Sequence, residues 1–412
     1  MPQKAILLVL LVAVTSLSQF YRVSNSVIAP ELTRELGLSV QQLGWAGGAF
    51  FTALFAAQVP VGIWFDRYGA RRTVAALSVF AVIGAILLAR AESAAALIAA
   101  RAMIGLGCAA SFMSVVFLCA RWFEPMRLTS ALSWVFAASN LGTLAAATPL
   151  AWVAGAIGWR QAFFGVAGIT AVVAIAFATL VRDRPPGAIP PPPRRESLVD
   201  VLRGLGEVLK TPGLPPILAL HSVAYASMLT VLGVWGGPYL YDVHGLQGVA
   251  RGHVLFAMGL AQILGILAYG PLDRLVGSRR TVIVAGAAAT AFVLLLLGLV
   301  PRLPLGVVVC LLVLFCLLAA YPVVIVAQGR SLFPDRLAGR GVTTVNMAQL
   351  FGLVVLPSLT GWILAVLGEG GQPVPENAYR AVFLVLAGCL AAGAAAYAGS
   401  TRSTPQTPPP AR

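Results

Sequence analysis

Apolar residues run along almost the whole chain in stretches of about 20, separated by short segments that collect charged and turn-forming residues. A stretch of that length crosses a hydrocarbon core ~30 Å thick as an α-helix, since the helix satisfies every backbone polar group internally. The pattern therefore predicts an all-α membrane protein. We expect twelve transmembrane helices, at residues 5–27, 43–64, 74–90, 95–119, 129–153, 162–181, 217–239, 252–272, 281–300, 304–327, 341–366 and 379–399.

Composition supports this prediction and excludes a soluble protein. Hydrophobic residues make up 59% of the 412 positions, charged residues only 10%, and the mean hydropathy is +0.89. A soluble domain carries roughly a quarter charged residues. The first apolar run is longer than the core of a signal peptide, so we expect it to be retained as the first helix.

The net charge of +14 is explained by its distribution. With an even number of helices and both termini inside, cytoplasmic segments hold about 20 Lys and Arg residues and external loops about 6. This bias predicts a multi-pass protein of a bacterial inner membrane with both termini in the cytoplasm. It indicates orientation in the lipid bilayer, and we expect no nucleic-acid partner.

The chain contains an internal repeat. The segment Gly62-Ile-Trp-Phe-Asp-Arg-Tyr-Gly-Ala-Arg-Arg72 is matched by Gly270-Pro-Leu-Asp-Arg-Leu-Val-Gly-Ser-Arg-Arg280. Arg121-Trp-Phe-Glu-Pro125 is matched by Arg330-Ser-Leu-Phe-Pro334, and Trp159-Arg160 by Tyr379-Arg380. Three ordered matches predict two pseudo-symmetric six-helix bundles.

The expected domain boundaries follow from this repeat. Residues 1–181 form the N-terminal bundle and residues 217–400 the C-terminal bundle. Residues 182–216 are Pro-rich and charged and are expected to be a cytoplasmic linker, with a short interfacial helix at 197–210. The Ser/Thr/Pro-rich tail, 401–412, is expected to be disordered.

With these motifs the chain resembles the major facilitator superfamily along essentially its whole length. The loop at 62–72 matches the strongest signature of that superfamily at every fixed position, whereas the loop at 270–280 has its first glycine one residue closer to the Asp. Arg101-x-x-x-Gly105-x-Gly107 and Gly158-Trp159-Arg160 are weaker matches. The resemblance implies a secondary active or facilitative transporter that works by rocker-switch alternating access.

The Asp-Arg loops are expected to take part in gating. Gly69 supplies a positive φ for the tight reversal, and Asp66 needs an ionic partner or a helix N-terminus. The resemblance implies that Asp66 contacts Arg121 and the eleventh helix, and so locks the inner gate. The expected gating residues are Asp66, Arg67, Arg71, Arg72, Arg121, Asp273, Arg274, Arg280 and Arg330. The alternative is that the loops only set topology.

Two arginines, Arg22 and Arg101, fall inside the predicted spans. An intramembrane charge costs roughly 2.5–3.5 kcal/mol at a helix centre and marks a functional site by default. Arg22 belongs to a polar stripe with Thr15, Ser18 and Asn25 at helical spacing. Alternatively, Arg22 snorkels to the interface and Arg101 binds helix carbonyls.

The segment around Arg22 also resembles the first helix of organic-anion symporters, which carry Asp-Arg where this chain has Tyr21-Arg22. The resemblance implies that Arg22 grips a substrate carboxylate. The C-terminal half offers aromatic candidates instead: we expect Tyr225 and Tyr321 in the pathway, and Trp235, Tyr239 and Tyr241 in an interfacial belt. The expected substrate-binding residues are Arg22, Arg101, Tyr21, Asn25, Ser18, Tyr225, Tyr321 and Asn140.

Acidic residues all fall in loops or at helix ends, and His221 lies inside the seventh helix. Coupling to protons is therefore absent, runs through the substrate's own charge, or uses His221. The five cysteines lack paired ligand spacing, so neither a metal site nor a disulfide is expected. No cofactor is expected, no enzyme site stands out, and the chain is expected to be a monomer.

Transport of a small organic anion is the leading hypothesis, because the predicted cavity contains arginine side chains and no acidic side chains. The alternative is a drug efflux transporter, a proton antiporter, which would favour a membrane carboxylate and a Gly-Pro-rich fifth helix. The segment Asn140–Pro149 contains the Pro but not the full Gly-Pro pattern. A transporter-like sensor would need a larger soluble element than 182–216.

Overall fold

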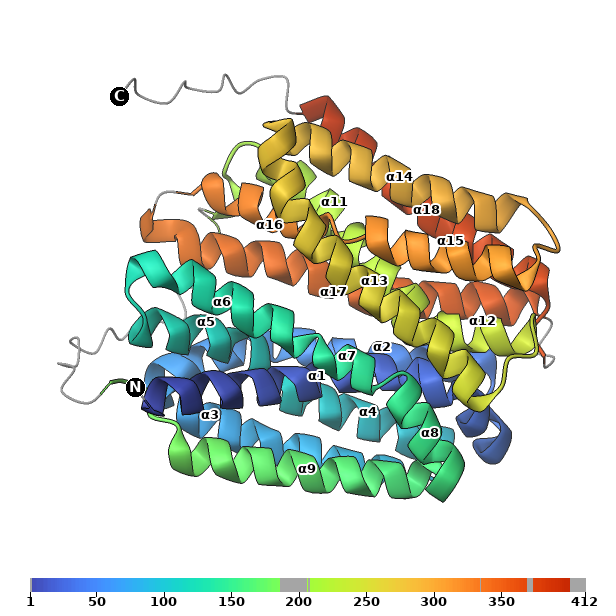
Figure 1. Ribbon diagram of the computed structural model, residues 1–412, viewed down its shortest axis with the longest axis horizontal. Helices are drawn as coiled ribbons and strands as arrows, with labels where there is room; N and C mark the ends of the chain where they lie inside the picture. The colour runs from blue at the N-terminus through green and yellow to red at the C-terminus, as the bar shows by residue number, and fades with distance from the viewer. Residues whose placement is uncertain (1, 186–205, 207, 334, 369–372, 401–412) are drawn as a thin grey trace.

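The computed structural model describes residues 2–185, 206, 208–333, 335–368 and 373–400. Every regular element in these residues is helical (Figure 1). The first half contains α1 (Pro2–Leu36), α2 (Val40–Ala56), α3 (Gln58–Ala89), α4 (Ala94–Cys108), α5 (Ser111–Trp122), α6 (Pro125–Ser139), α7 (Leu141–Ala145), α8 (Thr148–Ile157) and α9 (Trp159–Leu180). The second half contains α11 (Leu214–Thr230), the π-helix η1 (Val231–Trp235), α12 (Gly236–Asp242), α13 (Gly248–Val276), α14 (Arg279–Leu299), α15 (Leu305–Leu318), α16 (Pro322–Ser331), α17 (Asp335–Leu367) and α18 (Glu376–Ser400).

Twelve helical segments in the described residues are long and apolar enough to cross a membrane. They run Gln3–Leu36, Val40–Phe65, Arg67–Ala89, Ala94–Trp122, Ser130–Ile157, Trp159–Leu180, Leu214–Asp242, Gly248–Val276, Arg279–Leu299, Leu305–Ser331, Thr344–Leu367 and Glu376–Gly399. The chain is a multi-pass membrane protein with two six-helix bundles, and the predicted fold class is confirmed.

The first span is longer than the prediction of 5–27. The helix α1 continues through Pro30 to Leu36 because its last turns leave the apolar region and their carboxylates find cationic partners. Glu31 pairs with Arg251, and Glu35 pairs with Arg160. Most of the linker, including the predicted helix at 197–210, and the tail at 401–412 lie outside the described residues.

Equivalent contacts occur in the two halves, as expected for a repeat. The Arg71 guanidinium donates to the carbonyl of Ala178 near the end of α9, and Arg280 donates to the carbonyl of Ala398 near the end of α18. At the other end of the bundle, Arg160 donates to the Ala91 carbonyl at 2.9 Å, and its counterpart Arg380 donates to the Leu299 carbonyl at 2.8 Å. In each half, an arginine therefore satisfies orphan carbonyls at helix ends.

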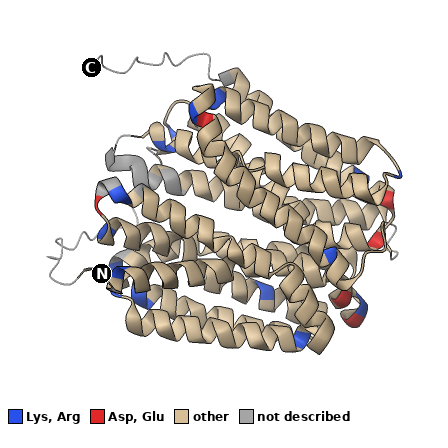
Figure 2. Cartoon of the chain, in the orientation of Figure 1, with Lys and Arg blue, Asp and Glu red and all other residues tan. Residues whose placement is uncertain are grey.

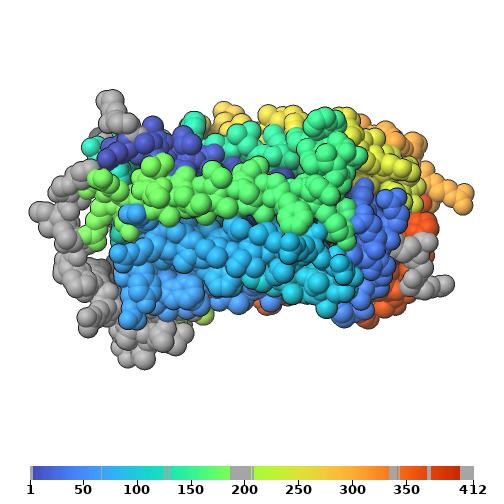
Figure 3. All heavy atoms as spheres, turned by 90° about the horizontal axis from the view of Figure 1, so that it is seen from below, coloured from blue at the N-terminus to red at the C-terminus, as the bar shows by residue number. Residues whose placement is uncertain are grey.

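The two ends of the bundle differ in charge (Figure 2). We call the end with the 66–72 and 273–280 segments the basic end; the chain begins there, and most Lys and Arg residues gather there. The other end, which we call the opposite end, carries residues 31–35 and 242–248, including the acidic residues Glu31, Glu35 and Asp242. Between the ends, α9 forms one long strip of the surface in the view of Figure 3. Its exposed Ile169, Val172 and Ile175 suit contact with lipid.

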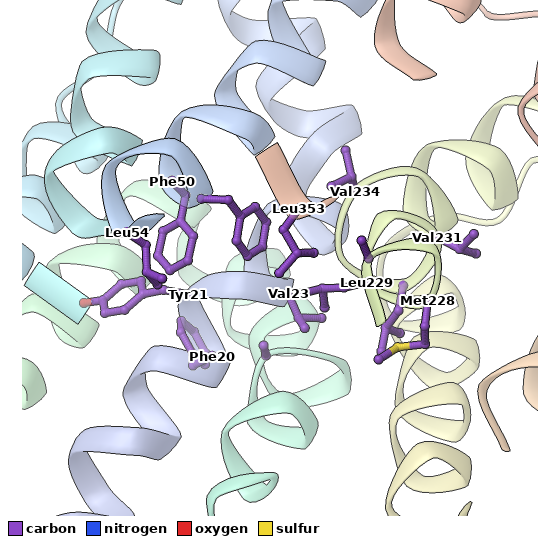
Figure 4. Packing of buried hydrophobic residues seen from close by; sticks show 14 of the residues in the cluster. Phe20, Tyr21, Val23, Phe50, Leu54, Met228, Leu229, Val231, Val234 and Leu353 are labelled. Carbon is purple, nitrogen blue, oxygen red and sulfur yellow. The ribbon is translucent and has the colours of Figure 1, made fainter. Parts of the chain in front are cut away.

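The halves pack closely toward the opposite end. A Cβ added at Gly44 would lie 3.1 Å from Cα of Gly361, and the backbone amide of Gly237 donates to the Ser26 hydroxyl at 2.8 Å. Small residues permit this close crossing of helices. Figure 4 shows the neighbouring apolar boundary, where side chains of α1 and α2 meet those of α11, η1 and α17 in one buried cluster.

The predicted interfacial belt of Trp235 and Tyr239 is wrong. Trp235 is 1% exposed, and its indole N–H donates to the Thr360 hydroxyl at 2.8 Å. Tyr239 is 3% exposed and packs edge-on against Tyr379 and Phe383. Both residues lie where α12 and η1 are covered by other helices, so burial inside the bundle replaces contact with the lipid headgroups.

Candidate functional site

A cavity of about 600 Å³ lies between the two halves. We call it the central cavity. From the first half it is lined by Thr15, Ser18, Gln19, Arg22, Leu54, Gln58, Cys108, Ala109, Phe112, Leu132, Ser133, Phe136, Ala137, Ser139 and Asn140. From the second half it is lined by Tyr225, Gln262, Ile266, Leu267, Gly270, Ala319, Ala320, Pro322, Val323, Val326, Asn346, Gln349 and Leu350. Its lining extends to Gly270, three residues before Asp273, and so runs toward the basic end.

Arg22 is the one charged residue among the described residues that line the central cavity. It is half-buried, and its Nε lacks a hydrogen-bond partner. The Ser18 hydroxyl, one turn earlier and 2% exposed, interacts with the Cys108 thiol. That thiol also lies close enough to interact electrostatically with Arg22. Arg22 therefore lines the cavity with a guanidinium whose Nε donor is unsatisfied.

The polar stripe of α1 is why Arg22 faces the cavity. Thr15, Ser18, Gln19 and Arg22 recur at separations of three and four residues, so they share a helix face. Thr15 satisfies itself by donating to the Leu11 carbonyl at 2.7 Å. The stripe was predicted, but Gln19 was missed even though it has the same periodicity.

Arg101 does not line the cavity. It is 1% exposed and lies between helices, donating from Nε to the Ala46 carbonyl at 3.2 Å and from Nη1 to the Tyr21 carbonyl at 2.7 Å. The Phe50 ring lies 5.0 Å from its guanidinium carbon. This is the arrangement of the structural alternative, in which the arginine binds helix carbonyls. In this conformation its guanidinium does not reach the central cavity, and its contact with substrate stays a prediction.

Two further candidates on α1 also point away from the cavity. Tyr21 is fully buried, and its hydroxyl lies 2.8 Å from the Thr170 hydroxyl of α9. Asn25 is 2% exposed, with its Nδ2 unpartnered, and does not line the cavity. Tyr21 lies on another face of α1, whereas Asn25 lies one turn after Arg22, beyond the lining of the cavity.

The candidates of the second half divide in the same way. Tyr225 lines the cavity, whereas Tyr321 is fully buried behind it, with its hydroxyl unpartnered and its ring 6.4 Å from that of Tyr269. His221 is fully buried and does not line the cavity, but its side chain interacts with that of Gln349, which does. In the first half, the remaining candidate Asn140 lines the cavity and donates to the Phe136 carbonyl at 2.9 Å.

Several lining residues were not predicted. Gln58 donates to the Leu54 carbonyl at 3.0 Å, and Gln262 is 5% exposed on α13. The rings of Phe112 and Phe136 stack, with centroids 5.0 Å apart. A glutamine inside an apolar run is a detectable signal, but the aromatic pair could not be told from ordinary packing.

The described residues include only part of the expected gating network. The Asp66 side chain lies outside the described residues, so its predicted lock is untested. The Arg121 guanidinium carbon lies 3.7 Å from the centroid of the Phe117 ring. Asp273 accepts from Arg279 at 3.3 Å. Exposed side chains among the predicted gating residues belong to Arg67, Arg71, Arg72, Arg274 and Arg330.

An unpredicted acid completes the first loop. Asp183, just after α9, accepts from the Arg71 backbone amide at 2.8 Å. Gly69 has φ +81°, as predicted, and a Cβ added there would lie 2.1 Å from Asp183 Oδ2. The helical part of α3 after Gly69 therefore starts with a carboxylate at its N-terminus, where the macrodipole favours an anion.

A second pocket, of about 830 Å³, lies at the opposite end. Its lining includes Arg34, Trp235, Tyr241, Asp242 and Gln247. The Asp242 carboxylate accepts from the Tyr379 hydroxyl at 2.6 Å. We call it the opposite-end pocket; it shares no lining residue with the central cavity.

The chain matches the model of the Major Facilitator Superfamily at residues 8–268 and 238–412. The chain belongs to the major facilitator superfamily. The proteins of this superfamily in the comparisons are transporters.

Curated relatives match it over different lengths. The putative tartrate transporter of Agrobacterium vitis is 23% identical over 84% of this chain and 81% of that protein. The probable galactarate/D-glucarate transporter GudP of Escherichia coli is 25% identical over 43% of this chain and 41% of that protein. The chain thus spans about two fifths of GudP but most of the tartrate transporter.

Solved structures share the fold. A bacterial homolog of the human lysosomal transporter Spinster, in an inward-facing and occupied conformation, superposes with a TM-score of 0.78, 18% identity and 98% coverage of both chains. The nucleoside transporter NupG superposes with a TM-score of 0.71 and 14% identity, over 98% of this chain and all of that one.

Proposed function

We propose that this protein transports a small organic anion through the central cavity by rocker-switch alternating access. The observation that carries the proposal is Arg22: a half-buried guanidinium with an unpartnered Nε, and the single charge in the described cavity lining. A cation at that depth costs roughly 2.5–3.5 kcal/mol on insertion scales, and a bound anion would offset that cost. A guanidinium also matches a carboxylate in bidentate geometry.

The names of the relatives support an anionic substrate. They include transporters of galactarate or D-glucarate, of tartrate, of sulfoacetate, and of nitrate or nitrite. These substrates differ in size and share negatively charged oxygens. The shared feature agrees with a cavity that carries a cation.

Efflux of cationic drugs is disfavoured by the same cavity. None of the described residues lining it is acidic, and Arg22 would repel a cation. A binding site for lipophilic cations would instead favour acidic residues in its lining and no arginine.

The basic end is proposed to face the cytoplasm of a bacterial inner membrane. Positive residues concentrate on the cytoplasmic side of membrane proteins, and both the start of the chain and the arginine-rich loops lie at this end. The central cavity runs toward it, and the opposite end is closed by contacts such as Gly44 with Gly361. The conformation is then inward-facing. In the outward-facing state, the Asp66 and Asp273 loops are proposed to lock the basic end.

The proposal is tested by thermal stabilisation of the purified protein with carboxylates, sugars, peptides and lipophilic cations. We expect stabilisation by one or more anions that is lost in Arg22→Ala. The exposed Arg90→Ala, at the opposite end, is the matched control and should keep the response. Stabilisation by cations alone, unchanged in Arg22→Ala, would reject the proposal.

A further inference from the structure

We propose that the central cavity selects an anion with one negative charge and a hydroxylated, uncharged tail. The inference rests on the proposed function and narrows its substrate class to hydroxylated monocarboxylates. It follows from the charges that a substrate can reach, the polar groups on the facing wall and the apolar surface beside them.

Only one cation in the described lining can touch a substrate. Arg22 lines the cavity, and no acidic or second basic residue does so in the part of the chain that the structure describes. Arg101 is nearby, but its guanidinium is 1% exposed and occupied by the carbonyls of Ala46 and Tyr21. One carboxylate can therefore be paired directly, and a second one cannot.

The facing wall is polar and neutral. Tyr225, Gln262, Asn346 and Gln349, on α11, α13 and α17, line the second half of the cavity. Amides and a phenol both donate and accept hydrogen bonds, which suits hydroxyl groups. A carboxylate placed against this wall only accepts hydrogen bonds. The side-chain amide oxygens would then have no donor and would face a negative charge.

The helix start in this wall does not supply an anion site. The helix α16 begins at Pro322, which has no N–H. The next amides are already used: Val323 donates to the Ala320 carbonyl at 3.4 Å, and Val324 donates to the Tyr321 carbonyl at 2.9 Å. Among the described residues of the second half, the cavity lining thus offers a second carboxylate neither a cation nor free amides at the start of α16.

Apolar surface completes the fit to a short carbon chain. The stacked rings of Phe112 and Phe136 line the first half, and Ile266 and Leu350 line the second. A pocket with a few placed polar groups on an apolar lining, at about 600 Å³, is typical of a small-molecule site. The C–H edges of a hydroxy acid can pack on the rings while its hydroxyls face the amides.

The test compares two probes that differ at one carbon. D-Gluconate carries one carboxylate and a terminal hydroxymethyl group, and D-glucarate carries a carboxylate at both ends. Titration calorimetry on the purified full-length protein should give a Kd for gluconate at least about tenfold lower than for glucarate, because the second carboxylate stays unpaired. Hexanoate, a monoanion without hydroxyls, should also bind more weakly than gluconate.

A charge-addition variant tests the cause of the selectivity. Gln262→Arg places a second cation on the facing wall and should move the preference toward glucarate by about tenfold or more. Gln349→Arg is a second variant in case the first fails to fold. Gln247→Arg, in the opposite-end pocket, adds the same charge away from the cavity and should leave the preference unchanged.

The outcomes separate this inference from the proposed function. If glucarate binds the unmodified protein as tightly as gluconate, or if neither binds, the inference is overturned. Anion transport would still stand in either case if tartrate, sulfoacetate or nitrate bound in an Arg22-dependent way. If no anion binds while a lipophilic cation such as tetraphenylphosphonium does, both proposals are overturned together.

Discussion

Arg251 of α13 donates from Nη2 to both carboxylate oxygens of Glu31 on α1, at 2.8 and 2.9 Å. The same nitrogen donates to the Val27 carbonyl at 2.7 Å, and Arg251 is 1% exposed. This ion pair joins the two halves of the protein at the opposite end. It must break if that end opens while the basic end closes.

Removing Arg251 should therefore shift the protein toward opening at the opposite end. Breaking a buried ion pair by deleting one partner costs about 3–5 kcal/mol in the state that contains it. Spin labels at Arg34 and Gln247, exposed positions on different halves beside the opposite-end pocket, would report the change by pulsed EPR. In Arg251→Met, the population with a long distance between the two labels should be larger than in the protein that keeps Arg251.

Arg160→Met is the matched control for this experiment. Arg160 pairs with Glu35 at 2.7 Å at the same end, but both residues belong to the first half and are partly exposed. Its loss should leave the distance distribution unchanged. Equal distributions in Arg251→Met and the unmodified protein would mean that the pair does not hold the halves together.

Two glycines lie where helices cross closely, and we expect their replacement by alanine to lower the stability of the protein. A Cβ added at Gly142 would lie 1.8 Å from the Ser16 carbonyl oxygen, and one at Gly352 would lie 1.6 Å from that of Ser222. Alanine at either position forces backbones apart, at a cost of about 1–3 kcal/mol or more. The unfolding midpoint in detergent should fall by ~2–4 °C for each kcal/mol.

Gly388→Ala provides the comparison for these variants. No atom lies within 4 Å of a Cβ added at this glycine in α18. Alanine there should hold or raise the midpoint, because it favours helix by about 1 kcal/mol over glycine. A midpoint drop at Gly388 as large as at Gly142 would contradict the packing described.

The first Asp-Arg loop predicts that Asp183 stabilises the protein. Its carboxylate accepts from the Arg71 amide, so Asp183→Ala should lose about 0.5–2 kcal/mol, as for a removed helix cap. Gly69→Ala should lose more, since φ +81° disfavours a side chain and the Cβ would meet Asp183. Thermal unfolding measures both. Glu92→Ala, at an exposed acid of the opposite end, should leave stability nearly unchanged.

His221 is predicted to be dispensable for transport. It is fully buried and its side chain interacts with that of Gln349, so His221→Gln, which keeps a neutral polar group there, should stay close to the unmodified protein in stability. Because His221 does not line the cavity, any stimulation of uptake by a proton gradient should persist in the variant. Loss of that stimulation with uptake otherwise intact would assign proton coupling to His221.

The fold could be predicted well from the sequence, because the lengths of the apolar runs and the internal repeat determine it directly. The twelve spans and the positive φ at Gly69 follow from single-helix patterns. The orientation of Arg22 toward the cavity could also be predicted, because a polar stripe marks one side of α1. The predicted boundary at residue 27 was wrong because the partners of Glu31 and Glu35 come from distant segments.

The role of Arg101 could not be read from its own helix. Arg101 and Gly105 share one face of α4, and a Cβ at Gly105 would lie 2.0 Å from the Phe50 carbonyl oxygen. That face is therefore pressed against α2, which turns Arg101 toward backbone carbonyls instead of the cavity. Rotation of a helix is set by its neighbours, so intramembrane charge alone did not separate Arg22 from Arg101.

The central claim is that Arg22 binds the transported anion, and uptake into proteoliposomes tests it most directly. Radiolabelled anions, beginning with gluconate and tartrate, are measured with the unmodified protein, Arg22→Gln and Arg90→Ala. The account predicts saturable uptake that falls by about 100-fold or more in Arg22→Gln, since a charge-assisted bidentate contact is lost, and that stays unchanged in Arg90→Ala. Saturable anion uptake of equal rate and KM in Arg22→Gln and the unmodified protein would contradict it.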